Sequence, residues 1–251
     1  ISYSAGFNAT AVNLGRLQNR GIEALIGVTP VQGKVTWDVS LNVAKNNNKV
    51  VSLIAGSTEL VLEEPRTRNV FIKHIVGYPY GMITGRVQRK DPSGNLVFDA
   101  AGSPVGNASY QIIGNGVADL TGGLNNTVTW NNFNLSALID FKFGGDLFSG
   151  TNIRLTGWGY HQQTLIGRAG EAPLTIKGVV QTGTNASGPI YEPIQKTLTP
   201  HEAQRYWSTT TSEQNGTTDH YLYYASFAKL RQVTIGYAFP KSLISKTPFE
   251  T

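Results

Sequence analysis

The sequence predicts an all-β fold, namely an antiparallel segment of a transmembrane β-barrel. Three observations lead there: long runs in which apolar and polar residues alternate, almost no helical periodicity, and short connections that alternate with very long ones. Charged residues make up 15% of the 251 residues, below the roughly 25% of an average globular domain. Asn, Thr, Ser and Gly fill this deficit, and they favour wet strands and loops over helices.

The alternating runs predict six strands, and the run from Phe133 to Phe143 is the clearest. One of its faces carries Phe, Leu, Ala, Ile, Phe and Phe, and the other carries Asn, Ser, Leu, Asp and Lys. Strands of about 10 residues with such faces and aromatic ends are typical of membrane barrels, whereas strands of soluble sandwiches have about 5 or 6 residues. The expected strands are residues 1–11, 19–29, 34–46, 122–131, 133–144 and 223–239.

The connections between these strands form two classes. Short ones are expected at Pro30–Lys34, at Asn131–Asn132 and from Pro240 onward. Two long stretches cover residues of about 47–121 and 145–222. All short turns then fall on one side of the sheet and both long stretches on the other, which is how outer-membrane barrels are built. The long stretches are therefore predicted to be extracellular loops, with residues 1–251 forming one part of a barrel domain.

Local signals predict some structure inside the long stretches. Thr199 is a suitable N-cap, Pro200 fits the first helical position and Glu202 favours the helix start, so a short helix is expected to Trp207. Possible strands between Phe71 and Arg89 predict a small hairpin. Asp91–Asn95 is a strong turn signal that also resembles the start of a calcium loop, so a plain turn and a calcium site both stay open.

Several functional classes are not supported. The chain has no Cys, which excludes disulfide frameworks and thiol-based sites, and no apolar run approaches the ~18 residues of a spanning helix. No leader-like segment opens the chain, and the scattered Lys and Arg residues do not indicate nucleic-acid binding. The four His residues lack the spacing of metal ligands. No catalytic constellation is recognised, so neither an enzyme nor a cofactor is expected.

The aromatic residues of the second long stretch are the candidate ligand contacts. Flat rings flanked by Asn, Gln and Thr can stack on sugar rings or peptide side chains while amides bind hydroxyl groups. The substrate-binding candidates are Trp158, Tyr160, Tyr206 and Trp207, of which the first two are favoured. The alternative is an interfacial aromatic girdle with loop packing, and Tyr221–Tyr224 have the most girdle-like position.

A series of short motifs resembles the SusC/RagA family of TonB-linked outer-membrane transporters. No single motif is specific, but together they span nearly the whole chain in the family's order. They include Asn19–Glu23, Thr29-Pro30, Trp37–Val39, Lys45–Val51, Gly77–Met82, Asp91–Asn95, Asp99–Gly102, Gly122–Thr127, Asn132–Ser136, Gly144-Gly145, Ala225–Arg231 and Phe239–Leu243.

The resemblance implies the late strands of a plugged barrel of about 22 strands, with the plug and the final strands absent from this sequence. It further implies a location in the outer membrane of a Bacteroidota-type bacterium and active import of an oligosaccharide or peptide. By the same resemblance, TonB would act through the plug, and a SusD-like surface lipoprotein would be a partner. Besides membrane lipid, no other partner is implied.

Two alternatives from other classes remain. A soluble, lectin-like all-β module would enclose the apolar strand faces in one core and would fold without detergent. A passive porin or adhesin barrel would have no plug and would not depend on TonB.

Overall fold

The computed structural model describes residues 15–54, 56–62, 70–212, 216–240 and 244–245. The chain forms two compact units. The sheet unit comprises Asn19–Asn48, Val117–Gly145 and Tyr224–Thr251. The mixed unit comprises Ile1–Gln18, Lys49–Gly116 and Asp146–Tyr223. Each unit joins three separate stretches of sequence, so long-range contacts hold both together.

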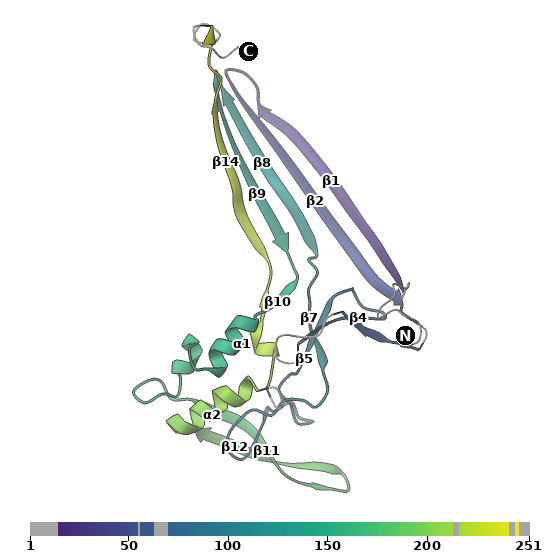
Figure 1. The fold of residues 1–251 in the computed structure, drawn as a ribbon, viewed down its shortest axis with the longest axis vertical. Coiled ribbons are helices and arrows are strands. Elements are labelled where there is room, and N and C mark those ends of the chain that lie inside the picture. The colour runs from purple at the N-terminus through teal and green to yellow at the C-terminus, as the bar shows by residue number, and fades with distance from the viewer. Residues whose placement is uncertain (1–14, 55, 63–69, 213–215, 241–243, 246–251) are drawn as a thin grey trace, which may run out of the picture. The chain divides into compact units, whose positions relative to one another are not determined.

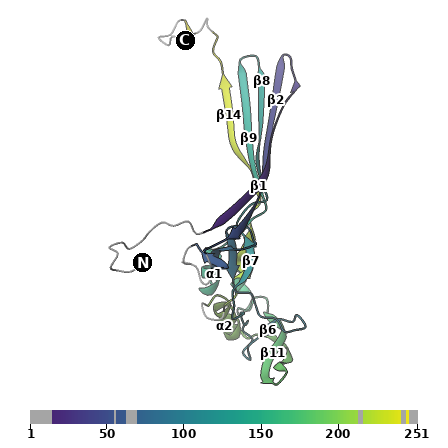
Figure 2. The same cartoon turned by 90° about the vertical axis from the view of Figure 1, so that its right-hand side faces the viewer.

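Five long strands lie side by side in the sheet unit (Figure 1). In spatial order they are β1 (Arg16–Val31), β2 (Val35–Ser52), β8 (Leu120–Trp130), β9 (Phe133–Phe143) and β14 (Phe227–Tyr237). The pairs β2–β8, β8–β9 and β9–β14 are antiparallel. Figure 2 shows the sheet as a single layer of strands. Five of the six predicted strands are thus confirmed, and the sixth, residues 1–11, lies outside the described residues.

The tight turn between β8 and β9 has the predicted position. Asn131 has a φ of 50°, the one positive value at a non-glycine residue in the described part of the chain. Asn tolerates this left-handed conformation, which two-residue hairpin turns require, and Trp130 pairs directly with Phe133 across it. The turn predicted from Pro30 is shorter than expected because β1 continues to Val31. Most of the turn predicted from Pro240 lies outside the described residues.

The mixed unit holds three smaller sheets. The four-stranded one has the order β3 (Glu59–Val61), β4 (Phe71–Ile75), β5 (Met82–Gly85) and β7 (Gln111–Asn115). The three-stranded one has the order β12 (Gly188–Thr197), β11 (Thr175–Asn185) and β6 (Val97–Phe98), and β10 (Asp146–Phe148) pairs with β13 (Leu222–Tyr224). The antiparallel pair β4–β5 confirms the hairpin predicted after Phe71. The pair β6–β11 is parallel and is an exception to the predicted antiparallel pairing, which the fold otherwise mostly follows.

Short helices complete the mixed unit. They are α1 (Gly150–Gly157), η2 (Gln162–Leu165), α2 (Pro200–Thr210) and η3 (Asp219–Tyr221), the two η elements being 3₁₀ helices. The predicted helix is confirmed as α2, with Thr199 as its N-cap. Among the described residues, no helix combines the length and apolar character that a membrane crossing needs.

A small apolar core lies in the mixed unit. The buried residues Phe98, Ile176, Leu198 and Ala203 pack together, and Tyr206 packs against them. This core joins three elements, namely β6, β11 and α2. Leu198, which directly precedes the N-cap of α2, completes it. The two long stretches between the sheet strands are therefore folded together by their own apolar contacts. Their extracellular position stays a prediction.

Candidate functional site

One face of the sheet unit is apolar across four strands. Leu41, Leu124, Ile139 and Leu230 form one row across β2, β8, β9 and β14. Trp37, Val128, Leu135 and Ile235 form a second row nearer the hairpin turns. Half of these side chains are exposed, Leu135 by 47% and Ile235 by 76%, and the others are half-buried. Because exposed apolar area forgoes roughly 25 cal/mol of burial free energy per Å², such a face favours an apolar surrounding.

Aromatic rings line both ends of the apolar face. At the turn end, Trp130, Phe133 and Tyr237 are in register across β8, β9 and β14. The ring centroids of Trp130 and Phe133 are 6.4 Å apart, and those of Phe133 and Tyr237 are 4.6 Å apart. At the opposite end of β9, the rings of Phe141 and Phe143 lie 5.4 Å apart. Two aromatic borders around an apolar band are typical of strands that cross a membrane.

The apolar band has the height of a bilayer core. Phe133 and Phe143 are the first and last residues of the 11-residue strand β9. Ten steps of about 3.3 Å give a length of about 33 Å along the strand. At the usual tilt of about 40°, this length spans about 25 Å along the membrane normal, which matches the apolar band of outer-membrane barrels.

The other face of the sheet is polar and hydrogen-bonded. Thr29 Oγ1 donates to Asp38 at 2.6 Å, and Asn134 Nδ2 donates to Thr129 Oγ1 at 3.0 Å. A β-bulge in β14 between Leu230 and Gln232 inserts Arg231, whose Nη1 lies 3.6 Å from Asp140 Oδ2. Such side chains need water or polar partners, so this face suits a wet lumen.

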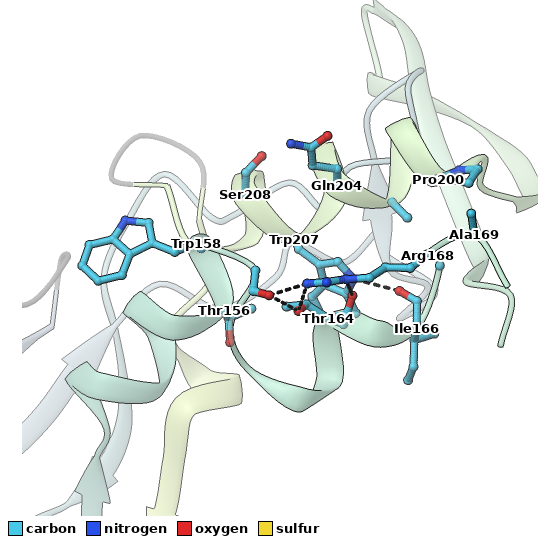
Figure 3. Close-up of a pocket in the computed structure, with 14 residues that line it drawn as sticks. Thr156, Trp158, Thr164, Ile166, Arg168, Ala169, Pro200, Gln204, Trp207 and Ser208 are labelled. Carbon is cyan, nitrogen blue, oxygen red and sulfur yellow. Dashed lines mark hydrogen bonds between the residues drawn. The ribbon is translucent and has the colours of Figure 1, made fainter. Parts of the chain in front are cut away.

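A pocket of about 340 Å³ opens in the mixed unit, between the α1–η2 segment and α2 (Figure 3). Helix α2 supplies one wall with Gln204, Trp207 and Ser208, which the helical repeat places on one side. The facing wall comes from the turn after α1 and the segment after η2, including Trp158 and Arg168. The volume lies within the usual range of small-ligand pockets, about 300–1,000 Å³.

The N-terminus of α2 is fixed by a capping box. Thr199 Oγ1 accepts from the Glu202 amide, and the Glu202 carboxylate accepts from the Thr199 amide at 3.0 Å. Lys196 Nζ also donates to Glu202 at 2.6 Å. These hydrogen bonds lower the pKa of Glu202 to about 2. The bond from Lys196 has the largest effect, and the bond from the Thr199 amide comes next. The cap therefore determines where α2 begins and thus which residues face the pocket.

Arg168 is held rigidly at the pocket. Its Nε donates to the Thr164 carbonyl at 3.0 Å, and its Nη2 donates to Thr164 Oγ1 at 3.1 Å and to the Gly159 carbonyl (Figure 3). The preceding Gly167 has a φ of 94°, and a Cβ there would clash with Ala203 Cβ on α2. Only glycine allows this close approach, so Gly167 brings Arg168 alongside the helix.

The structure separates the four predicted ligand contacts. Trp158 and Trp207 both line the pocket, but Trp158 is 61% exposed and its ring points away from Trp207 (Figure 3). Trp207 Nε1 donates to the Ile166 carbonyl at 3.0 Å. Tyr160 is 78% exposed outside the pocket lining, and Tyr206 packs on the core, where burial raises its pKa. Substrate binding by these four residues stays a prediction.

The girdle interpretation of Tyr221–Tyr224 is wrong at its first residue. Tyr221 is 1% exposed inside the mixed unit, and its hydroxyl accepts from Gln163 Nε2 at 3.4 Å. Tyr224, by contrast, is 89% exposed. Proximity to the last strand was therefore a poor guide, because the short helix η3 turns Tyr221 inward before the chain reaches β14.

Arg168 and Gln204 are pocket residues that the sequence analysis did not select. Gln204 lies in the predicted helix but belongs to no motif, and Arg168 lies in a segment without periodicity, so their spacing marks neither as a ligand contact. The one available signal was the concentration of glycines around Arg168, where Gly159, Gly167 and Gly170 all have positive φ values. Such glycines indicate a specific tight backbone path, although not its ligand.

The Asp91–Asn95 segment is a closed turn. The Asp91 carboxylate accepts from the Ser93 amide, the Asn95 amide and Asn95 Nδ2 at 2.7–2.9 Å. These hydrogen bonds lower the pKa of Asp91, and the bond from the Asn95 side chain has the largest effect. The predicted turn is therefore confirmed, and calcium binding by these residues stays a prediction. Within the described ranges, no cluster of three or more His, Asp and Glu side chains is placed to hold a metal ion.

Comparisons with known proteins agree with the motifs. No family model matches the chain. A TonB-dependent receptor of Formosa agariphila is 24% identical over 98% of this chain and 24% of its own length. A second from that organism is 23% identical over 99% of the chain and 26% of its length. The TonB-dependent receptor SusC of Bacteroides thetaiotaomicron is 31% identical over 47% of the chain and 12% of its length.

Solved structures share the fold. The RagAB peptide transporter matches 98% of this chain and 26% of its own with a TM-score of 0.54 at 17% identity. The RagAB peptide importer in its open-open state matches 99% of this chain and 25% of its own with a TM-score of 0.55 at 16% identity. The chain thus spans about a quarter of the length of these proteins. The predicted resemblance is confirmed: the chain is similar in sequence to TonB-dependent receptors, SusC among them, and it shares the fold of the RagAB structures.

Proposed function

We propose that the sheet unit is part of the wall of an outer-membrane barrel that imports a nutrient in a TonB-dependent manner. The observation that carries this proposal is the apolar face with an aromatic row at the turn end and the pair Phe141 and Phe143 at the other end, opposite a polar, hydrogen-bonded face. Lipid would cover the apolar face, and water in the lumen would hydrate the polar face. The relationship to TonB-dependent receptors supports the energy source.

The mixed unit then belongs to the extracellular side. Both of its long connecting segments leave the sheet from the ends opposite the tight β8–β9 turn, and barrels of this kind have their long loops outside. The pocket beside α2 is the candidate contact for the cargo, an oligosaccharide or a peptide. A SusD-like surface lipoprotein is the proposed partner in capture, supported by the similarity to SusC and to the RagAB structures. TonB would act through a plug outside this chain.

The lectin-like alternative requires the apolar strand faces to be enclosed in a core. The exposed rows on the sheet do not fit that requirement, because a soluble protein rarely leaves so wide an apolar face open. A passive barrel would satisfy the same two faces. Dependence on TonB is therefore the property that separates the importer from a porin.

Cysteine labelling of the full-length protein in outer membranes tests the two faces. The chain has no cysteine, so Leu135→Cys on the apolar face and its neighbour Ser136→Cys on the polar face form a matched pair. We expect a small hydrophilic maleimide to label Ser136→Cys and to spare Leu135→Cys, because water reaches only the lumen. Equal labelling of the two positions would contradict a lipid-facing side.

Transport is tested separately in cells. We expect growth on the cargo to require both this protein and TonB, and to fall when either gene is deleted. Growth that persists without TonB would favour the passive barrel, even if the labelling pattern agrees with a membrane wall.

A further inference from the structure

The pocket beside α2 has an uncompensated positive charge. Among the described residues that line it, Arg168 is the one ionised side chain, and no carboxylate faces it. The guanidinium makes no ion pair with any described residue. The guanidinium is therefore either solvated by water or neutralised by a bound anion.

Arg168 also keeps two donors available. A guanidinium has five N–H groups, and the contacts to Thr164 and Gly159 use those of Nε and Nη2. Nη1 makes no hydrogen bond within the described part of the chain. The three bonds fix the guanidinium before a ligand arrives, so little side-chain entropy is lost when an anion binds.

Most other polar groups of the pocket are already engaged. Thr156 Oγ1 donates to the Asn152 carbonyl, and Ser208 Oγ donates to the Arg205 carbonyl at 3.0 Å. The side-chain amide of Gln204 has no hydrogen bond to a described residue, and Gln204 lies one helical turn before Trp207 and Ser208 on α2. Its amide therefore offers both a donor and an acceptor to a ligand.

Trp207 completes the set with a flat apolar surface. Because Trp207 Nε1 is bonded to Ile166, the indole has no donor left and contributes its ring. Tyr206 meets this ring edge-on, with centroids 5.0 Å apart and planes at 88°, which holds its orientation. The pocket thus offers a fixed cation, an amide and a ring platform.

We propose that this pocket binds a carboxylate-bearing sugar ring, a hexuronate unit of an acidic oligosaccharide. The carboxylate binds Nη1 of Arg168, the apolar face of the sugar stacks on Trp207, and a hydroxyl group pairs with the Gln204 amide. This assignment rests on the proposed function only in treating the ligand as cargo. It narrows the cargo from oligosaccharide or peptide to an acidic oligosaccharide.

The charge separates an acidic sugar from a neutral one. A neutral sugar would leave the Arg168 charge without a counterion and would gain only stacking and amide contacts. A peptide carboxylate offers the same anion but lacks a sugar ring with an apolar C–H face and hydroxyl groups beside it. The combination of Arg168, Trp207 and Gln204 therefore favours the uronate.

Binding to the full-length protein in detergent tests the proposal by isothermal titration calorimetry. The probes are tetragalacturonate, its neutral methyl ester and tetraalanine. We expect tetragalacturonate to bind most tightly, and its affinity to fall about ten- to a hundredfold in Arg168→Gln, as for loss of a charge-assisted hydrogen bond. The matched control is Arg205→Gln, which removes a cation of α2 that does not line the pocket and should leave binding unchanged.

Gln204→Glu keeps the test decisive if Arg168→Gln does not fold. Gln204 is an exposed helix residue, so its replacement should fold, and the new carboxylate should repel tetragalacturonate while sparing the methyl ester. Equal binding of the acid and its ester, tighter binding of tetraalanine, or equal losses in Arg168→Gln and Arg205→Gln would overturn the assignment. None of these results affects the cysteine labelling or the TonB dependence, which test the proposed function independently.

Discussion

The two units use the same kinds of apolar residue in opposite ways. In the sheet unit, Leu230 is 61% exposed and Ile235 is 76% exposed. In the mixed unit, Val97 is fully buried and Ile153 is 1% exposed. The mixed unit therefore has the interior of a water-soluble domain, whereas the sheet unit presents its apolar side chains outward. The difference shows that an alternating pattern defines a face but does not specify what covers it.

The arrangement of polar groups separates the units in the same way. Several buried threonines of the mixed unit donate to backbone carbonyls, as Thr210 Oγ1 does to the Tyr206 carbonyl at 2.7 Å. In the sheet unit, polar side chains of one face pair across strands, as Thr29 and Asp38 do. A water-soluble fold satisfies its polar groups locally, whereas a barrel wall separates them onto its lumen face.

Matched truncations of one isoleucine in each unit should give the largest difference in the free energy of unfolding between the units. Ile153→Ala empties a buried site on α1, and we expect it to destabilise the mixed unit by about 2–5 kcal/mol. Ile235→Ala on the outward face of β14 should cost less than about 1 kcal/mol, because detergent or lipid fills the space left behind. Urea unfolding in detergent, with amide hydrogen exchange to assign each unit, measures both. Equal costs would contradict a lipid-facing position for Ile235.

A charge placed near the middle of the apolar band tests the membrane side directly. Ile139→Arg puts a guanidinium between the aromatic row at the turn end and the Phe141–Phe143 pair, where it should cost about 2–4 kcal/mol of assembled stability. The control Ser136→Arg lies on the polar face of the same strand and should be tolerated. The fraction of protein that folds into lipid vesicles, read from heat-modifiable gel mobility, compares the two. Tolerance of Ile139→Arg would place water, not lipid, against this face.

Sequence reasoning recovered the sheet unit well because its signals are local and repeated. The alternation in Phe133–Phe143 and the Asn131–Asn132 turn determine β9 and its hairpin within a few residues. The helix α2 was also predictable, since its cap and first turn lie within four residues of each other. Each of these features depends on neighbours along the chain, which an isolated sequence displays.

The mixed unit and its pocket depend on distant contacts and were harder to predict. The strand β6 precedes its partner β11 by about 80 residues in the sequence, and no local pattern in either segment predicts that they pair. Trp207 was recognisable as an aromatic candidate, but Arg168 became a pocket residue only because Gly167 lets its backbone approach α2. Tyr206, chosen for its ring, turned out to serve the core.

The pH dependence of α2 gives the smallest expected effect and concerns the mixed unit alone. The contacts of Glu202 with Lys196 and Thr199 lower its pKa from 4.5 to about 2, so the ionised form is the one that the folded helix stabilises. This contribution is complete above pH 4.5 and is lost as the pH falls toward 2. Because the carboxylate is exposed, water and salt weaken it, and the change should be a fraction of the helix's local stability.

Glu202→Gln isolates this contribution. We expect the variant to lose part of the hydrogen-exchange protection of α2 at pH 6 and to show a flatter decline between pH 4.5 and 2 than the unmodified protein. Glu171→Gln is the matched control, because Glu171 forms no ion pair within the described residues and its loss should leave the profile unchanged. The strands of the sheet unit should keep their protection in both variants. A parallel loss there would mean that the capping box of α2 also supports the membrane wall, and the two units would then be one folding unit.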